Sequence, residues 1–345
     1  SMHNGLNLSD LDIVFPSVAS QYMDWIILLF LGGFLIAIAV EKWNLHKRIA
    51  LHILMIVGGQ PHRLVLGFMV ATGFLSMWLS NTSITLMMMP MAMSLILLYE
   101  ELNREAAATG VEIDVRAGNF SLTLLLGIAY AASIGGFATL IGTPPNGILI
   151  AQMPQLFPEA PEISFASWMA FALPMSVTYM LIAWFVLSRL VFPLPTSTPF
   201  SGREFIREEI AKLGAMSIEE KRVSFVFVSA ALLWMSRKER LFGANVDIFG
   251  WTHYLDSLLL WFGSKPVGYM IDDGTVSIAM ALLLFIIPAG KGVGGRLMDW
   301  DDAKKVPWGI LLLFGGGLAL AKGFTVSGLG AYVVGQLHPL FDEAD

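Results

Sequence analysis

The chain has 345 residues, of which 56% are hydrophobic and only 14% are charged, and its formal net charge is −6. A water-soluble fold cannot bury so much uncharged chain, whereas a helix that crosses a bilayer needs about 20 apolar residues. The composition therefore predicts an all-α polytopic membrane protein. The lack of cysteine excludes disulfides and thiolate metal sites, and the acidic balance without a basic stripe argues against a nucleic-acid partner.

Residues 1–23 form an N-terminal segment without the layout of a signal peptide. Residues 24–61 are expected to form one membrane span and a helix on the membrane surface. The span is the uncharged run Trp25–Val40. The stretch Glu41–Val57 mixes basic and apolar residues, which is typical of a helix that lies in the membrane interface.

Two uncharged stretches in the next region, Leu64–Tyr99 and Ala117–Pro158, are too long for single crossings. At a rise of about 1.5 Å per residue they would reach about 54 Å and about 63 Å as straight helices. The hydrocarbon core is only about 30 Å thick. The first stretch therefore predicts a re-entrant hairpin over 62–101, and the second predicts a broken helix over 118–155.

The remaining segments are simpler. Residues 163–190 are expected to form a full span, which completes a first-repeat transport region over 62–192. Residues 193–222 are charged and contain proline, as expected of a cytoplasmic connector. Residues 223–345 are expected to hold the scaffold spans that begin a second repeat.

An internal similarity supports this division into repeats. Phe30-Leu-Gly-Gly-Phe-Leu-Ile-Ala reappears as Phe314-Gly-Gly-Gly-Leu-Ala-Leu-Ala. If the two copies are equivalent, the first repeat is expected to begin before residue 1. The counterpart of the segment Ser80-Asn81-Thr82 in the second repeat is then expected beyond Asp345. The sequence then contains one complete binding element and the scaffold that precedes the other.

Each overlong stretch contains one polar break. Ser80-Asn81-Thr82 interrupts the first stretch, and Gly142-Thr143-Pro144-Pro145-Asn146 interrupts the second. Non-helical backbone at membrane depth is tolerated only where it is buried in protein or lines a cavity. Paired interrupted segments of this kind indicate the binding site of a transporter.

The breaks predict ligand chemistry through their helix ends. A helix that ends at the first break offers unpaired carbonyls from about Ser76 to Ser80, which suit Na⁺ together with the Asn81 amide oxygen. A helix that starts there offers N–H groups and a positive dipole end to a carboxylate. In the second break, Gly142 is expected to end one half-helix, with Thr143 as the N-cap of the next and Pro144 as its first residue.

The breaks contain no Asp, Glu, Lys or Arg. A proton relay normally needs titratable groups at membrane depth, so the sequence argues against one. An anionic substrate would have to be held by neutral dipoles and by bound cations. An intramembrane hydrolase is also disfavoured, because no base accompanies Ser80 in its segment, so the chain is not expected to be an enzyme.

These two breaks, together with Val40–Leu51, Ala132–Gly136 and the segment from Pro307 to Gly323, resemble the divalent anion:sodium symporter family. This family includes INDY and the sodium-coupled citrate and dicarboxylate transporters. The resemblance implies an inverted-repeat transporter with a hairpin in each repeat, and a homodimeric scaffold that carries the transport domains like an elevator. It also implies that Na⁺ is the coupling ion.

The resemblance assigns residues as well. It implies that the sodium site uses Ser76, Ser80, Asn81 and Gly142. It implies that Asn81, Thr82, Thr143 and Pro144 contact the substrate carboxylate. The family's second hairpin is not found in the sequence.

The leading hypothesis is therefore sodium-coupled secondary active transport of a di- or tricarboxylate, such as succinate or citrate. The protein would be integral to the plasma membrane or the bacterial inner membrane. Two alternatives remain open at this point. One is a dicarboxylate exchanger of the same family, and the other is a membrane scaffold that does not transport.

Overall fold

The structure is a computed structural model that describes residues 18–110, 115–195, 202–237, 250–290 and 294–329. Within these ranges its regular elements are all helices. The described residues contain no strand, only an isolated β-bridge between Pro288 and Arg296. Four of the described helical segments are long and apolar enough to cross a membrane: Trp25–Lys42, Asn81–Ala108, Val115–Gly136 and Phe165–Val191. The all-α membrane fold predicted from composition is confirmed.

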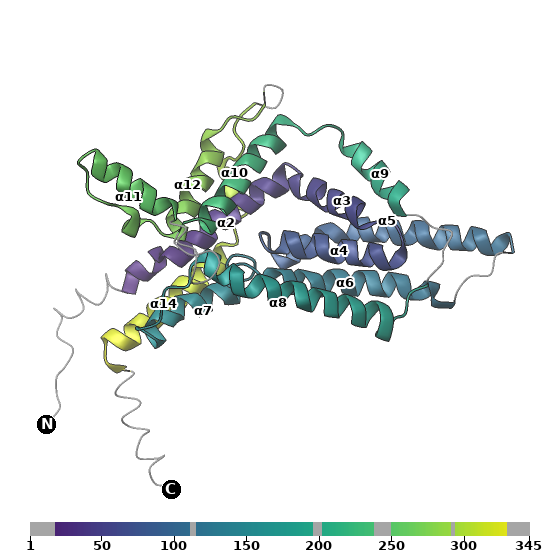
Figure 1. The fold of residues 1–345 in the computed structure, drawn as a ribbon, viewed down its shortest axis with the longest axis horizontal. Coiled ribbons are helices and arrows are strands. Elements are labelled where there is room, and N and C mark those ends of the chain that lie inside the picture. The colour runs from purple at the N-terminus through teal and green to yellow at the C-terminus, as the bar shows by residue number, and fades with distance from the viewer. Residues whose placement is uncertain (1–17, 111–114, 196–201, 238–249, 291–293, 330–345) are drawn as a thin grey trace, which may run out of the picture.

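The helices follow one another in the order shown in Figure 1. They are η1 (Ser20–Met23), α2 (Trp25–Lys42), α3 (Leu45–Val57), α4 (Pro61–Ser76), α5 (Asn81–Ala108), η2 (Val115–Gly118), α6 (Asn119–Gly136), α7 (Pro144–Leu156), α8 (Phe165–Phe185), η3 (Val186–Val191), α9 (Gly202–Leu213), α10 (Ile218–Met235), α11 (Trp251–Trp261), η4 (Gly268–Met270), α12 (Asp273–Ile286), α13 (Trp300–Ala303) and α14 (Trp308–Val326).

The helices α4, α5, α6 and α8 form one bundle, which lies on the right in Figure 1. Helices α4 and α6 run parallel, because Met69 of α4 lies against Gly127, and Gly73, one turn later, lies against Gly135. The Gly73 carbonyl oxygen is 2.1 Å from the position that a Cβ on Gly135 would occupy. Only glycine permits this approach, and small residues at such contacts are how membrane helices pack closely.

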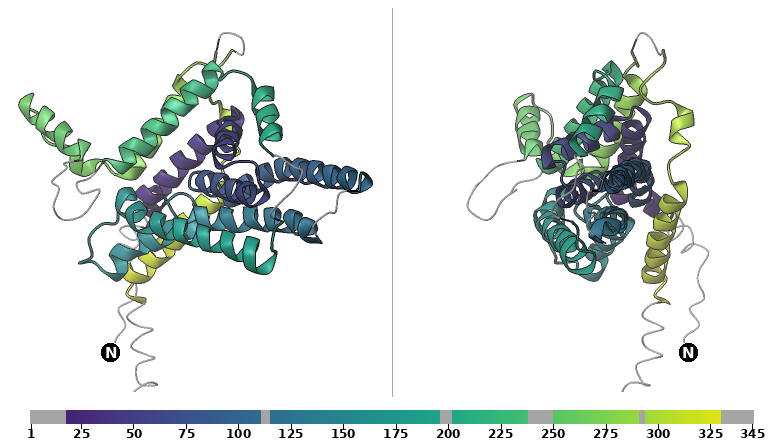
Figure 2. Two further views of the ribbon diagram at one scale, coloured as in Figure 1. Left: turned by 45° about the vertical axis from the view of Figure 1, so that its right-hand side comes forward. Right: turned by 90° about the vertical axis from the view of Figure 1, so that its right-hand side faces the viewer.

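A second group consists of α2, α10 and α12. Helices α10 and α12 pack against α2 on the side away from the bundle (Figure 1). The Ser277 hydroxyl of α12 donates to the Leu29 carbonyl oxygen of α2 at 2.8 Å. A Cβ on Gly32 would lie 2.3 Å from the Ser277 Oγ. Helix α14 crosses the lower part of this group beside α7, and Figure 2 shows α11 projecting away from the body.

Local sequence explains where the main helices begin. Asp24 caps α2 by accepting the Ile26 N–H at 2.9 Å, as short polar residues commonly do at an N-cap. Asn44 adopts a left-handed conformation with φ of 56°, which separates α2 from the surface helix α3. Ser217 and Glu220 form a reciprocal capping box at the start of α10.

Three boundaries differ from the sequence prediction. Helix α6 ends at Gly136 and not at Gly142, since the backbone turns away after Gly135, which packs on α4, and Gly136, which lies against Asn81 of α5. Helix α5 continues to Ala108, beyond residue 101. Its last turns consist of good helix formers, and the charged residues among them do not end a helix. Helix α10 begins at Ile218, inside the predicted connector, where its capping box supplies the start signal.

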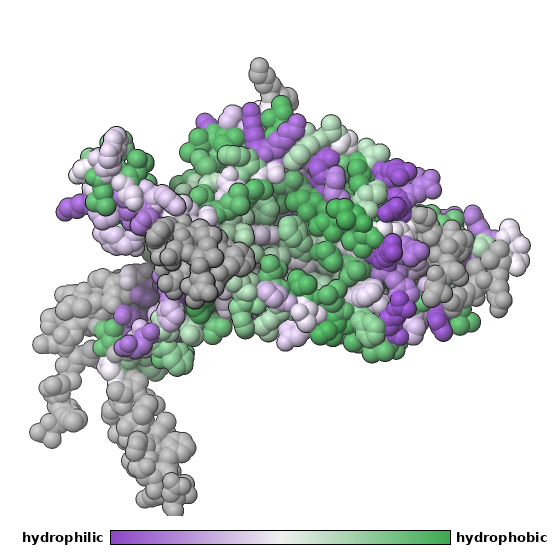
Figure 3. Space-filling model, viewed as in Figure 1, coloured by the Kyte–Doolittle hydropathy of each residue, from purple (hydrophilic) through white to green (hydrophobic). Residues whose placement is uncertain are grey.

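The exterior of the bundle is apolar. Large side chains such as Leu122 of α6 and Phe171 and Leu181 of α8 are exposed. Figure 3 shows hydrophobic residues over much of the visible flank and hydrophilic ones gathered around α9. On α3, Arg48 pairs with Glu220 at 2.9 Å and donates to the Gly214 carbonyl at 3.0 Å, which fixes this surface helix to the start of α10.

Candidate functional site

The two predicted breaks meet in the interior of the protein. Because α4 and α6 run parallel, their C-terminal ends lie together, and the helices that follow them, α5 and α7, both start at the same place. The C-terminal ends bring unpaired carbonyl oxygens and partial negative charge, whereas the N-terminal ends bring partial positive charge. One small region therefore has groups suited to a cation beside groups suited to an anion.

Oxygen atoms cluster at the carbonyl-rich side. The Ser76 hydroxyl, in a fully buried residue, lies 2.6 Å from both the Asn81 Oδ1 and the Ala132 carbonyl oxygen. A hydroxyl has one hydrogen, so these three oxygens share a single proton. Uncharged oxygens that are crowded in this way are hard ligands, which suit an alkali or alkaline-earth cation better than a soft metal.

Gly142 lies against the same cluster. A Cβ at this position would be 2.3 Å from the Gly136 carbonyl oxygen and 2.9 Å from the Ser76 carbonyl oxygen. The second of these oxygens belongs to the first break, so the two breaks approach each other through backbone atoms. A side chain at Gly142 would fill the space between these carbonyls.

The remaining predicted cation residue, Ser80, is the N-cap of α5. Its hydroxyl accepts the Ser83 N–H at 3.1 Å and donates to the Ser83 Oγ at 2.9 Å. The hydroxyl is therefore occupied by capping, and the carbonyl of Ser80 accepts the Ile84 N–H at 3.0 Å. Ser80 thus lies at the site as part of the α5 cap, whereas Ser76, Asn81 and Gly142 form its interior.

The predicted substrate residues line one wall of a cavity of about 640 Å³. These residues are Asn81, Thr82, Thr143 and Pro144. Asn81 and Thr82 stand in the first turn of α5, where backbone N–H groups have no partner within the helix. In α7 the first two residues are proline, which has no N–H, so the first turn of α5 offers N–H groups that the start of α7 lacks.

The opposite wall of the cavity carries charge that no motif indicated. Glu41, at the end of α2, lines the cavity together with Ser83 of the hairpin tip, and Lys42 and Lys305 also face the cavity. These residues come from α2 and from the loop before α14, far from the breaks in sequence. Only the folded arrangement brings them to the site.

Asp302 pairs with both lysines, and Lys42 also lies 3.5 Å from Asp299. Lys42 hydrogen-bonds to Asp302, and the Lys305 Nζ lies 2.9 Å from the same carboxylate. Burial alone would raise the pKa of Asp302, but the hydrogen bonds from both lysines outweigh it and lower the pKa below its usual value. Asp302 is therefore ionised at neutral pH, and the mouth of the cavity is close to electrically balanced.

One residue missed in the sequence, Thr139, connects the two breaks, and Asn146 supports the second break from within. Thr139 is fully buried, and its hydroxyl donates to the Met77 carbonyl and accepts the Gly142 N–H at 3.1 Å. The Asn146 amide donates to the Thr139 carbonyl at 2.7 Å and to the Gly136 carbonyl at 3.2 Å. Asn146 therefore satisfies backbone carbonyls of the segment between α6 and α7. Thr139 had no signal, since its partner Met77 is distant in sequence.

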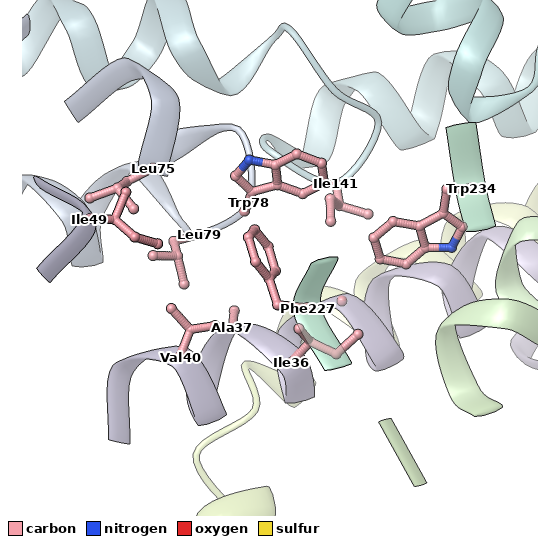
Figure 4. A pocket seen from close by; sticks show the side chains of 11 residues that line it. Ile36, Ala37, Val40, Ile49, Leu75, Trp78, Leu79, Ile141, Phe227 and Trp234 are labelled. Atoms are coloured by element: carbon pink, nitrogen blue, oxygen red, sulfur yellow. The ribbon is translucent and has the colours of Figure 1, made fainter. Parts of the chain in front are cut away.

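An apolar layer separates the tip from α10. The ring of Trp78 is stacked 6.1 Å from that of Phe165 and lies edge-on at 5.1 Å from Phe227, and Phe165 in turn stacks on Trp234 at 5.0 Å. Figure 4 shows Trp78, Phe227 and Ile141 facing one apolar space. This layer is the contact between the hairpin tip, the start of α8 and helix α10.

Comparison with known proteins agrees with this architecture. The model of the sodium:sulfate symporter transmembrane region matches residues 7–344. The chain is 42% identical over 324 residues to the sodium-dependent dicarboxylate transporter SdcS of Staphylococcus aureus, covering 94% of the chain and 57% of that relative. It is 41% identical over 321 residues to SdcS of Staphylococcus saprophyticus, covering 93% and 56%.

The chain therefore spans about half the length of the curated relatives it matches. The family match extends over nearly all of the chain, and its apolar helices are those of an integral membrane protein. The chain belongs to the sodium:sulfate symporter transmembrane family.

Proposed function

We propose that this chain forms the sodium and substrate half-site of a carrier that transports dicarboxylates by sodium-coupled secondary active transport. The observation that carries the proposal is the meeting of the α4 and α6 C-terminal ends with the α5 and α7 N-terminal ends. The names of the relatives from two Staphylococcus species, sodium-dependent dicarboxylate transporters, support both the ion and the substrate class.

Sodium binds among the carbonyls of Ser76, Ser80 and Gly142 and the amide oxygen of Asn81. These are neutral oxygens, and in the described part of the chain no cluster of three or more His, Cys, Asp or Glu side chains offers a metal a charged site. In a cage of neutral oxygens, the binding energy of a monovalent cation can offset the cost of removing its water shell. The site thus favours sodium over a divalent metal.

The dicarboxylate binds beside the cation, where Asn81, Thr82, Thr143 and Pro144 line the cavity. The cavity, of about 640 Å³, lies within the usual range for small-molecule sites, about 300–1,000 Å³. Neither break contributes a cationic side chain, so the charge of the bound anion is balanced by sodium. This dependence of one ligand on the other is the basis of the coupling.

Transport is proposed to follow an elevator mechanism, in which the bundle of α4 to α8 moves against α2, α10 and α12. The contact between the two parts near the tip is largely aromatic, through Trp78 and Phe165 on one side and Phe227 and Trp234 on the other. These apolar contacts have no directional bonds that must break when the parts slide, so the directional bonds that movement would have to break lie elsewhere, between Asp273 and the Phe165 N–H and between Arg237 and Glu162. Citrate-like tricarboxylates remain within the proposed substrate class.

The test is uptake by the protein expressed from its complete gene, purified and reconstituted in proteoliposomes. Labelled succinate should accumulate under an inward sodium gradient, and the accumulation should vanish when choline replaces sodium or an ionophore collapses the gradient. Uptake in choline that depends on unlabelled succinate inside the vesicles would instead establish exchange. Failure of both modes would reject carboxylate transport.

A further inference from the structure

One side chain joins the two breaks at their centre. Thr139 lies in the seven-residue segment between α6 and α7, and its side chain is completely buried. Its hydroxyl donates to the Met77 carbonyl of the first break and accepts the Gly142 N–H of the second at 3.1 Å. Among the residues that the structure describes, none of the proposed sodium ligands makes this hydrogen-bonded connection.

The bridge requires a hydroxyl. A hydroxyl can donate one hydrogen bond and accept others at the same time through a single atom. The hydroxyl hydrogen is donated to the Met77 carbonyl on one loop, and the hydroxyl oxygen accepts the Gly142 N–H on the other. Both roles are filled by one Oγ atom.

The bonds fix the peptide planes next to the proposed sodium ligands. The bond to the Met77 carbonyl fixes the peptide plane between Met77 and Trp78, which follows the plane that carries the Ser76 carbonyl. The bond from the Gly142 N–H fixes the peptide plane between Ile141 and Gly142, which precedes the plane that carries the Gly142 carbonyl. The Ser76 and Gly142 backbones also approach each other closely, so a shift of either loop changes the size of the space between them.

We propose that Thr139 is a positioning residue that sets the affinity for sodium by tying the two loops of the cation site together. This inference rests on the proposed sodium site. Thr139 does not touch the ion or the carboxylate. It acts through Met77 and Gly142, as groups behind metal ligands act by orienting them.

The substrate side of the site has separate support. Thr143 and Pro144 begin α7, and the Asn146 N–H bonds the Thr143 carbonyl at 3.2 Å. The Asn146 side chain still holds the carbonyls of Gly136 and Thr139 when the Thr139 hydroxyl is removed. Loss of the hydroxyl should therefore loosen the cation cage more than the carboxylate contacts.

The expected effect follows from this separation. Thr139→Val keeps the shape of the side chain and removes both hydrogen bonds. Loss of a group that orients metal ligands typically lowers affinity about 10- to 100-fold, so the half-saturating sodium concentration should rise by about that factor. At saturating sodium, both the maximal uptake rate and the succinate KM should return close to wild type.

The experiment uses two readouts on the complete gene product. The first is the rise in unfolding temperature as NaCl replaces choline chloride, which reports sodium binding without transport. The second is labelled succinate uptake as a function of sodium. Thr139→Ser restores the hydroxyl and should recover sodium affinity. The control is Thr123→Val in α6, which removes another fully buried hydroxyl, one that donates within its own helix to Asn119 at 2.7 Å and also lies 3.5 Å from the Phe192 carbonyl oxygen.

The results separate this inference from the proposed function. A sodium response in wild type that is shifted in Thr139→Val, recovered in Thr139→Ser and unshifted in Thr123→Val supports it. A wild-type-like sodium response in Thr139→Val overturns it and leaves the sodium site in place. An equal loss in both valine variants, or in the serine variant, reduces Thr139 to a packing role. A wild type that does not respond to sodium overturns both claims.

Discussion

At the scale of single residues, Asn81 and Thr143 define where the proposed ligands meet. Asn81 lies 2.6 Å from the Ser76 hydroxyl through its Oδ1, and it is also the first residue of α5, whose N-terminus faces the cavity. Thr143 precedes α7, but its hydroxyl makes no bond to the first turn of that helix. The Thr143 side chain is thus not needed as a cap and is available to a ligand.

Thr143→Val should weaken substrate binding without unfolding the protein. A hydrogen bond to a charged carboxylate contributes about 1.5–3 kcal/mol, which corresponds to an increase in the succinate KM of about 10- to 150-fold. The measurement is initial uptake at saturating sodium. Thr178→Val is the matched control, because that hydroxyl is bonded within α8 to Pro174 at 2.8 Å. An unchanged KM in Thr143→Val would place the carboxylate elsewhere.

At the scale of elements, the sequence predicted the breaks because charge-free stretches longer than a bilayer must fold back. It did not predict where α6 ends, because the pair Gly135 and Gly136 could equally continue a tightly packed membrane helix. Thr139, Glu41 and Lys305 carried no signal, since each acts through partners that are distant in the chain. Contacts of that kind are set by the packing of helices, which local periodicity does not encode.

A buried ion pair anchors α8, α10 and α12 at the other end of the aromatic layer. Asp273, which is fully buried, accepts the Arg237 Nε at 2.5 Å and the Phe165 N–H at 3.0 Å, and Arg237 also pairs with Glu162 at 3.2 Å. Burial lowers the pKa of Arg237, but its bonds to Asp273 and Glu162 outweigh this and raise it above its usual value. Arg237 is therefore charged, and its loss would leave the fully buried Asp273 side chain without this partner.

Asp273→Ala should destabilise the protein strongly. Breaking a buried pair by removing one partner costs about 3–5 kcal/mol, which should appear as a large drop in the unfolding temperature in detergent. Asp272→Ala is the neighbouring control, because Asp272 is an exposed N-cap that accepts the Thr275 N–H at 2.6 Å, and the loss of a cap costs about 1 kcal/mol. Equal drops in the two variants would show that the pair does not anchor these helices.

At the scale of the whole molecule, the two copies of the internal similarity lie on α2 and α14. Their equivalent residues Phe30 and Phe314 contact each other, with ring centroids 5.4 Å apart. Equivalent residues of two repeats meet when they lie close to the axis that relates the repeats. The bundle of α4 to α8 stands on one side of α2, and its tip opens into the cavity that α2 and the segment before α14 complete.

The central claim is that sodium and a dicarboxylate bind together at this tip, and the most direct measurement is protection of the cavity from a charged thiol reagent. The chain has no cysteine, so Lys305→Cys places a single reporter on the wall opposite the proposed ligands, and Glu208→Cys on α9 serves as an exposed control outside the cavity. Succinate with sodium should slow modification of the reporter, whereas succinate in choline should not, and the control should react at the same rate in both. A reporter that reacts equally fast with and without succinate in saturating sodium would contradict the account.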